Sequence, residues 1–174
     1  MVALCSERLA MRSAHGFTLV ELLVTVALMG ILLGIGVPSY TFLVSEVRAH
    51  TLASDLQDAL HMARAEAVMS RSRVIVCRRN VGGTACDPGT DWSRGWVILR
   101  ADASHPTAAV VRMWGGDQSM AVTGPHAGLS FQPNGMTATA ASFSISVPEC
   151  SGPRVRKLVV SLVGTTRRDK GECR

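Results

Sequence analysis

The hydrophobic and polar positions of the chain change their period twice. Residues 17–44 read FTLVELLVTVALMGILLGIGVPSYTFLV, an apolar run whose only charged residue is Glu21. About 20 such residues, rising 1.5 Å each in a helix, cross the hydrocarbon core of a bilayer. The run therefore predicts a transmembrane helix over residues 17–44 and a single-pass membrane protein.

A second stretch, residues 45–73, contains no proline or glycine and has a helical period. Its small and apolar residues recur every three or four positions, at Leu52, Leu56, Ala59, Leu60, Ala63 and Ala67. Polar residues occupy the positions between them, as in an amphipathic helix. We expect this stretch to continue the first helix and to pack its narrow apolar stripe on the rest of the chain.

From residue 74 onward the period is two, which is typical of strands. Alternating or short apolar runs cover residues 74–77, 95–99, 109–114, 142–147 and 154–163. In the last run Leu158, Val160 and Leu162 are expected to share one face. Glycine- and proline-rich turns separate the runs. The pattern predicts an antiparallel sheet packed on the helix, an α+β fold with a β-rich domain over residues 74–174.

Charge is concentrated at the C-terminal end. The 174 residues carry a formal net charge of +5, and the stretch from Arg154 to Arg174 holds seven basic and two acidic residues, which accounts for the whole excess. Two interpretations stay open. The basic end binds an anionic partner, nucleic acid or lipid headgroups, or it is a solvated surface that keeps the protein soluble.

Catalytic motifs are absent from the sequence. The histidines are scattered without an HExxH pair, the glycine pairs match no phosphate-binding loop, and no serine lies in a GxSxG. We therefore expect no enzyme, no cofactor and no metal site. The length suits one domain with an appendage and excludes several enzyme modules or a polytopic transporter.

The N-terminal 16 residues are short and basic, with Arg8 and Arg12 on the expected cytoplasmic side. A secretory signal is cleaved after its apolar run, whereas here the distinctive junction Gly16-Phe17 precedes the run. Cleavage there would remove the leader and keep the anchor. The new amine of Phe17 would lie one helical turn from Glu21 and could compensate its charge, in the same chain or in a neighbour. The alternative is a plain anchor whose Glu21 stays hydrated near the interface.

The sequence Gly16-Phe17-Thr18-Leu19-Val20-Glu21, followed by the apolar run, resembles the class III signal of type IV prepilins and type II secretion pseudopilins. The resemblance implies a leader over residues 1–16, cleavage after Gly16 by a prepilin peptidase, and methylation of Phe17. It also implies that Glu21 acts in assembly with other pilins or pseudopilins. The protein would be anchored in the inner membrane, with a periplasmic globular domain, before it joins a filament.

Two globular segments narrow the family. Trp92-Ser93-Arg94-Gly95-Trp96-Val97 and Phe131-Gln132-Pro133-Asn134-Gly135 resemble signatures of the GspH/FimT group. This implies a type IV pilin-like fold and a minor type IV pilin that is incorporated into a pilus or primes it. The alternative is an H-type pseudopilin of a type II secretion system with a purely structural role.

Some FimT-type pilins contact DNA through a C-terminal Gly-Arg-x-Arg motif. Here the matching stretch is Gly164-Thr165-Thr166-Arg167-Arg168, in which Thr165 replaces the first arginine. The partial match implies sequence-independent binding of double-stranded DNA in natural transformation. The candidate residues are Arg154, Arg156, Arg167, Arg168 and Lys170.

Five cysteines are present, and Cys5 would be lost with the leader. The other four, Cys77, Cys86, Cys150 and Cys173, allow three disulfide connectivities in an oxidising periplasm. Pairs Cys77–Cys86 and Cys150–Cys173 are favoured, because the first would close a turn and the second would tie down the C-terminus. A zinc site is the competing interpretation, but no CxxC spacing supports it.

Overall fold

The computed structural model describes residues 16–101, 108–147, 150 and 152–173, so most of the expected leader, with Cys5, lies outside the described residues. The chain divides into two compact units, residues 1–41 and 42–174. The described elements are a long helix and eight strands: α1 (Leu19–Ser70), β1 (Val74–Arg78), β2 (Gly95–Arg100), β3 (Ala109–Gly115), β4 (Ala121–Thr123), β5 (Leu129–Phe131), β6 (Ala141–Ser146), β7 (Val155–Val160) and β8 (Thr166–Gly171).

Helix α1 covers most of both stretches for which the sequence predicts a helix, but it begins at Leu19 rather than at residue 17. It ends at Ser70, and Arg71 follows with a φ of 50°, the left-handed conformation that commonly closes a helix. Among the described residues, no helix meets the length and hydropathy required of a membrane crossing. The transmembrane assignment of residues 17–44 therefore stays a prediction.

Within the unit of residues 42–174, α1 buries one narrow stripe. The expected stripe is confirmed and is extended by Ala49 and Ala53, so that the buried set is Ala49, Leu52, Ala53, Leu56, Ala59, Leu60, Ala63 and Ala67. Alanine dominates this set, and its small side chain lets the sheets approach the helix closely. Every member belongs to one core cluster with buried residues from the strands.

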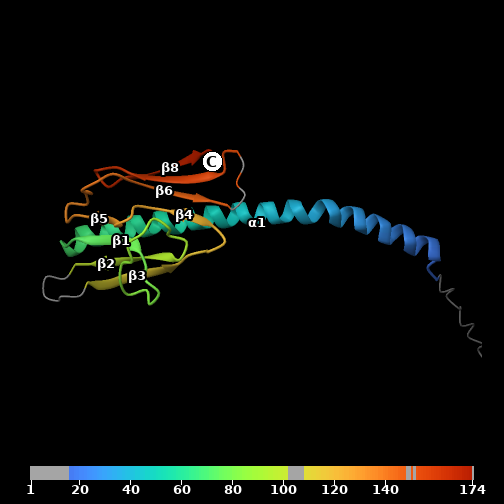
Figure 1. Ribbon diagram of the computed structural model, residues 1–174, viewed down its shortest axis with the longest axis horizontal. Coiled ribbons are helices and arrows are strands. Elements are labelled where there is room, and N and C mark those ends of the chain that lie inside the picture. Colours follow the sequence, from blue (N-terminus) through green and yellow to red (C-terminus); the bar gives the residue numbers. More distant parts are fainter. Residues whose placement is uncertain (1–15, 102–107, 148–149, 151, 174) are drawn as a thin grey trace, which may run out of the picture. The chain divides into compact units, whose positions relative to one another are not determined.

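Two antiparallel sheets complete this core, in the orders β3-β2-β1-β5 and β4-β6-β7-β8. Both lie along the C-terminal part of α1 (Figure 1). The bulkiest fully buried side chains are Trp92, Trp96, Phe131 and Phe143, and the rings of Trp92 and Phe143 meet edge to face at 5.1 Å. The α+β architecture predicted from the sequence is confirmed.

Sequence periodicity locates β1, β2, β3, β6 and β7 but not the other three strands. Strands β4 and β5 have three residues each, too few to show an alternation. Strand β8 reads TRRDKG and has no apolar residue; it is added to the sheet edge by backbone pairing with β7. The run expected over 154–163 is too long, because residues 161–165 form the β7–β8 turn and Leu162 is 51% exposed there.

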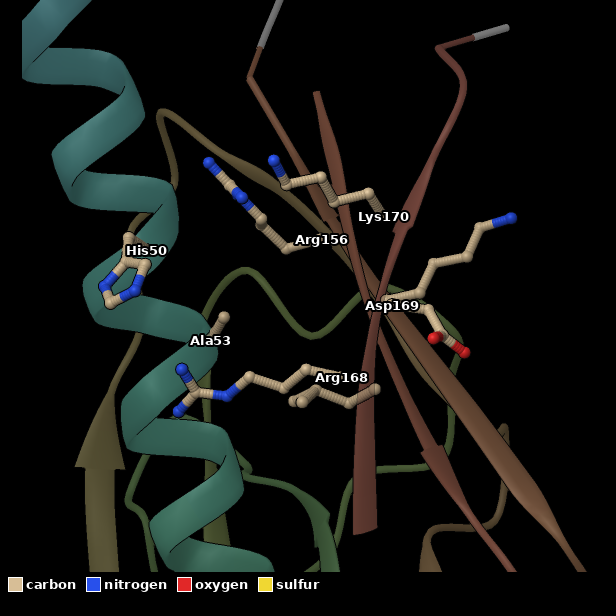
Figure 2. A pocket seen from close by; sticks show the side chains of 8 residues that line it. His50, Ala53, Arg156, Arg168, Asp169 and Lys170 are labelled. Atoms are coloured by element: carbon tan, nitrogen blue, oxygen red, sulfur yellow. The ribbon is translucent and has the colours of Figure 1, made fainter. Parts of the chain in front are cut away.

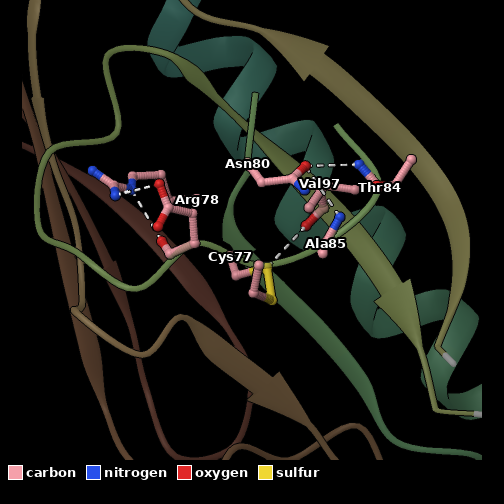
Figure 3. The surroundings of a disulfide bond; sticks show 8 residues. Cys77, Arg78, Asn80, Thr84, Ala85 and Val97 are labelled. Atoms are coloured by element: carbon pink, nitrogen blue, oxygen red, sulfur yellow. Dashed lines mark hydrogen bonds and ion pairs between the residues drawn. A yellow bond between two sulfur atoms is a disulfide. The ribbon is translucent and has the colours of Figure 1, made fainter. Parts of the chain in front are cut away.

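Both favoured disulfides are present, and each joins Cα atoms 5.5 Å apart. Cys77–Cys86 closes the loop after β1 over the outer face of that sheet, where Val97 and Leu99 form a second small apolar cluster with Cys77 (Figure 3). Cys150–Cys173 joins the segment before β7 to the segment after β8. The end of β8 is therefore linked covalently to the start of its neighbour strand.

The first prediction concerns the α1 stripe. Replacing the fully buried Leu56 with alanine should lower the free energy of unfolding by about 2–5 kcal/mol, because it leaves a cavity between helix and sheets. Asp58→Ala, on the exposed side of the same turn, should change it by less than about 0.5 kcal/mol. Urea unfolding followed by the fluorescence of the buried tryptophans measures both. Equal effects of the two substitutions would contradict the packing described.

Candidate functional site: an exposed apolar helix and a basic strand pair

The N-terminal end of α1 is set by a threonine. Thr18 precedes the first helical residue, and its Oγ1 accepts a hydrogen bond from the backbone N–H of Glu21 at 3.2 Å. Threonine at this position followed three residues later by glutamate is a helix-capping pattern. The cap places Glu21 in the first turn of the helix, where the macrodipole favours a negative charge. The sequence analysis named Glu21 and missed the cap, which the spacing Thr-x-x-Glu signals.

The first turns of α1 expose apolar side chains on every side. Phe17 is 82% exposed and Leu19 73%, and all described side chains from residue 16 to residue 35 are exposed. A helix that is apolar all round is stable when it is buried in protein or lipid. Gly16 and Phe17 lie just before this helix and are also exposed, so the junction is accessible to another protein.

The basic end of the chain folds into the neighbouring strands β7 and β8. Their register pairs Arg156 with Lys170 and Leu158 with Arg168. These four residues share the face that looks toward α1, whereas Arg167 and Asp169 share the opposite face. The structure therefore does not gather all five candidate DNA-binding residues on one surface.

Three of the five candidates contact α1 instead. Arg154 lies over the ring of Phe42 at 4.2 Å, and Nη2 of Arg156 pairs with Oε2 of Glu46 at 2.8 Å. Arg168 donates hydrogen bonds to Oε1 of Gln57 and, at 3.2 Å, to Oγ of Ser54. These contacts fasten β7 and β8 to the helix.

The other two candidates lie elsewhere on β8. Arg167 pairs with Asp169 on its own strand at 2.7 Å, which partly offsets its charge. The side chain of Lys170 is exposed and makes no hydrogen bond or ion pair with any described residue. The helix residues that receive the arginines were missed by the sequence analysis. The sequence does contain a signal for these helix residues. Residues 42, 46, 50, 54 and 57 recur at intervals of three and four, so they form a second stripe along the helix.

A hollow of about 210 Å³ lies between α1 and the two strands (Figure 2). Arg156 and Lys170 point into it on one side of Ala53 and Arg168 on the other, while Asp169 points away. His50 lines it from the helix, and Leu158 provides an apolar surface. The hollow thus brings together three of the five predicted basic residues, beside an apolar surface.

The glycine of the partial DNA motif has a structural role. Gly164 has a φ of 77°, and a Cβ there would collide with the carbonyl oxygen of Gly135. The side chain of Arg64 clamps the two turns together, since Nε donates to the carbonyl of Gly135 at 3.1 Å and Nη2 to that of Val163 at 3.0 Å. A glycine at residue 164 is therefore explained by the packing of two turns, without a ligand.

Together, the capped apolar helix and the sheets packed on its C-terminal part define a pilin-like protein. The model of the family described as type II transport protein GspH matches residues 52–164, and that of the prokaryotic N-terminal methylation motif matches residues 11–37. The chain belongs to the GspH family. No curated protein sequence matches it.

Solved structures agree with this assignment. The type IV minor pilin FimU of Pseudomonas aeruginosa is 25% identical, with a TM-score of 0.52 over 69% of this chain and 91% of that one. The minor pseudopilin EpsH of the type 2 secretion system of Vibrio cholerae is 16% identical, with a TM-score of 0.51 over 71% of this chain and 97% of that one. The second likeness concerns the fold alone. The family and these neighbours are structural pilins rather than enzymes.

The second prediction concerns the ion pair between Arg156 and Glu46, which joins β7 to α1. Arg156→Ala should lower the free energy of unfolding by about 1–3 kcal/mol, because the half-buried Glu46 carboxylate would lose its cationic partner. Arg167→Ala, which breaks the more exposed pair with Asp169, should lower it by less than about 1 kcal/mol. Chemical unfolding of the two variants and of Glu46→Ala/Arg156→Ala provides the measurement. If the double variant were no more stable than Arg156→Ala, the unpaired carboxylate of Glu46 would not be the cause of the destabilisation.

Proposed function

We propose that this protein is a minor pilin of a type IV pilus, cleaved after Gly16, methylated at Phe17 and assembled through the N-terminal part of α1. The observation that carries the proposal is that every apolar side chain of the described residues 17–35 is exposed, directly after a cleavage motif. Relative to exposure to water, burial of each large apolar side chain contributes about 1.5–3 kcal/mol. Outside the bilayer a row of such side chains would therefore keep the helix packed among neighbouring subunits, whereas inside the bilayer association depends on close packing and on polar pairs.

Pairing of the Glu21 carboxylate with an amine would fix how neighbouring subunits align along the helix axis. In the cleaved protein the α-amino group of residue 17 and the carboxylate of Glu21 are one turn apart on a helix that has no other charge up to residue 44. Within an apolar bundle an unpaired carboxylate is costly, so an arrangement that brings an amine to each Glu21 is favoured over all others.

Before assembly the same helix would hold the protein in the inner membrane as a single-pass anchor over residues 17–44, with the β-rich domain in the periplasm. The apolar run and the leader with Arg8 and Arg12 support this proposal. Two disulfides are consistent with an oxidising compartment. The partners implied are a prepilin peptidase and the other pilins.

The alternative is an H-type pseudopilin in a type II secretion system. The family description favours it, whereas the higher identity to FimU than to EpsH favours the pilus. Both use the same helix and differ in the filament that receives the subunit. Co-purification of the tagged chain with pilins or with pseudopilins distinguishes them.

The third prediction tests cleavage and assembly. Mass spectrometry of the protein from its native cells should find a mature chain that begins with methylated Phe17. Glu21→Ala should be cleaved but enter sheared filaments at a level reduced by about tenfold or more, since the charge pair is lost. Thr25→Ala, one turn further along the same exposed helix, is the matched control and should assemble normally. Mature protein that begins at Met1, or normal assembly of Glu21→Ala, would exclude the proposal.

A second candidate function is sequence-independent DNA binding at the basic strands, for natural transformation. One observation favours it: Arg156, Arg168 and Lys170 point into the hollow against α1, and the hydrogen-bond partners of Arg168 are uncharged, so its positive charge is retained. Phosphate contacts by such residues would release counterions and make binding strongly dependent on salt.

The fourth prediction tests that function on the full-length protein in detergent. DNA affinity should fall with salt, with a log–log slope of about 0.9 per phosphate contacted. Arg167→Ala/Arg168→Ala should reduce both affinity and slope, whereas Arg112→Ala, whose guanidinium lies over Trp114 on the other sheet, should change neither. Binding that is absent, or equal in the two variants, would rule out DNA recognition by β8.

A further inference from the structure

A rigid turn between two buried tryptophans presents Arg94 to solvent. Trp92 and Trp96 are both fully buried, and the intervening Gly95 has a φ of 105° and donates its N–H to the carbonyl of Trp92 at 2.9 Å. A Cβ on Gly95 would collide with the carbonyl oxygen of Trp114. The backbone that carries Arg94 is therefore fixed on both sides, and its side chain is exposed.

A second arginine is fastened to the same turn. The backbone N–H of Arg79 donates to the carbonyl of Gly95 at 3.2 Å, and its Nε donates to the carbonyl of Arg94 at 2.8 Å. Its Nη1 lies 3.6 Å from the sulfur of Met113. The guanidinium of Arg79 is thus oriented by neutral groups, which leave its charge uncompensated.

The loop after β1 is also rigid where it borders these arginines. The disulfide Cys77–Cys86 closes it, and Oδ1 of Asn80 accepts hydrogen bonds from the backbone N–H groups of Thr84 and Ala85 at 2.9 and 3.3 Å (Figure 3). The loop holds Asn80 beside Arg79 and leaves the next residue, Val81, 86% exposed.

These groups surround a shallow hollow of about 290 Å³ lined by Arg79, Asn80, Val81, Arg94 and Gln118. The lining includes two guanidinium groups and two amides, and no carboxylate. In the part of the chain that the structure describes, neither arginine forms an ion pair.

Asp91 is the carboxylate whose pKa responds to the charge of Arg94, but its side chain is hydrogen-bonded to Ser93 and does not line the hollow. Its Oδ1 accepts the backbone N–H of Ser93 at 3.0 Å. Hydrogen bonds from the backbone and the side chain of Ser93, and then the charges of Arg78 and Arg94, lower the pKa of this carboxyl. Asp91 therefore stabilises the turn through its hydrogen bond to Ser93 and does not line the hollow.

We propose that this hollow binds a carboxylate side chain of an acidic protein segment, on a neighbouring subunit of the filament. Guanidinium groups hold carboxylates with two parallel hydrogen bonds, and Arg79, whose guanidinium is already oriented, loses little conformational entropy on binding. The exposed Val81 on the rim favours a polypeptide, which can place an apolar side chain there, over a bare anion. The choice of a neighbouring subunit as the source rests on the proposed pilin function.

The site can be tested on unassembled protein. Full-length chain with its disulfides formed, in detergent micelles and with ¹⁵N-labelled arginine Nε, would be titrated with the capped peptide Val-Asp-Val-Glu. The expected result is saturable movement of the Arg79 and Arg94 Nε resonances. Binding should be weakened by about tenfold or more in Arg94→Gln, and less in Arg94→Lys, which keeps the charge but not the forked donors. Arg112→Gln, on the opposite face of the same sheet, is the matched control and should bind normally.

Several outcomes would overturn the proposal. Resonances that do not move show that the hollow binds no carboxylate. Equal movement with the neutral peptide Val-Asn-Val-Gln excludes recognition of charge, and tighter binding of inorganic phosphate than of the acidic peptide identifies a phosphate site. Equal weakening by Arg112→Gln would place the binding elsewhere. The titration needs neither cleavage nor assembly, so its failure leaves the Glu21 experiment intact, and failure of that experiment leaves the titration interpretable.

Discussion

The packing of the alanine-rich stripe of α1 against two sheets is the interaction on which the rest of the globular unit depends. Neither sheet has a second layer of its own to cover its inner face, so both bury that face in one core shared with the helix. Small side chains at residues 49, 53, 59, 63 and 67 make this close approach possible. Because the same helix extends toward Phe17, the element that organises the core is also the one proposed to join the subunit to its filament.

Most of this architecture could be predicted because it follows from periodicity. Helical spacing located the stripe, alternation located the long strands, and the order Gly16-Phe17 with Glu21 pointed to the family. What could not be predicted depends on contacts between distant residues. Strand β8 has no apolar pattern and exists through its backbone pairing with β7. Likewise, the partners of Arg154, Arg156 and Arg168 lie more than a hundred residues earlier in the chain.

The basic C-terminal end shows why charge alone is a weak guide to function. Composition treats its cations as one group, whereas the fold assigns them different tasks. Two fasten β7 to the helix, one fastens β8, and Arg167 pairs with its own strand. Charged residues on an edge strand such as β8 also discourage pairing with strands of other molecules. Arg79 and Arg94, which form no ion pair with any described residue, lie outside this group altogether, and only the fold brings them together.

The covalent bond between Cys150 and Cys173 has a mechanical consequence for a protein that works within a fibre. An edge strand with an unanchored end detaches easily, because its hydrogen bonds can break one after another from that end. Here that end is closed by the bond, so detachment of β8 would have to begin from the tight turn at Gly164, which Arg64 holds. Strand β8 is therefore restrained at both of its ends, by a covalent bond at one and by the hydrogen bonds of Arg64 at the other.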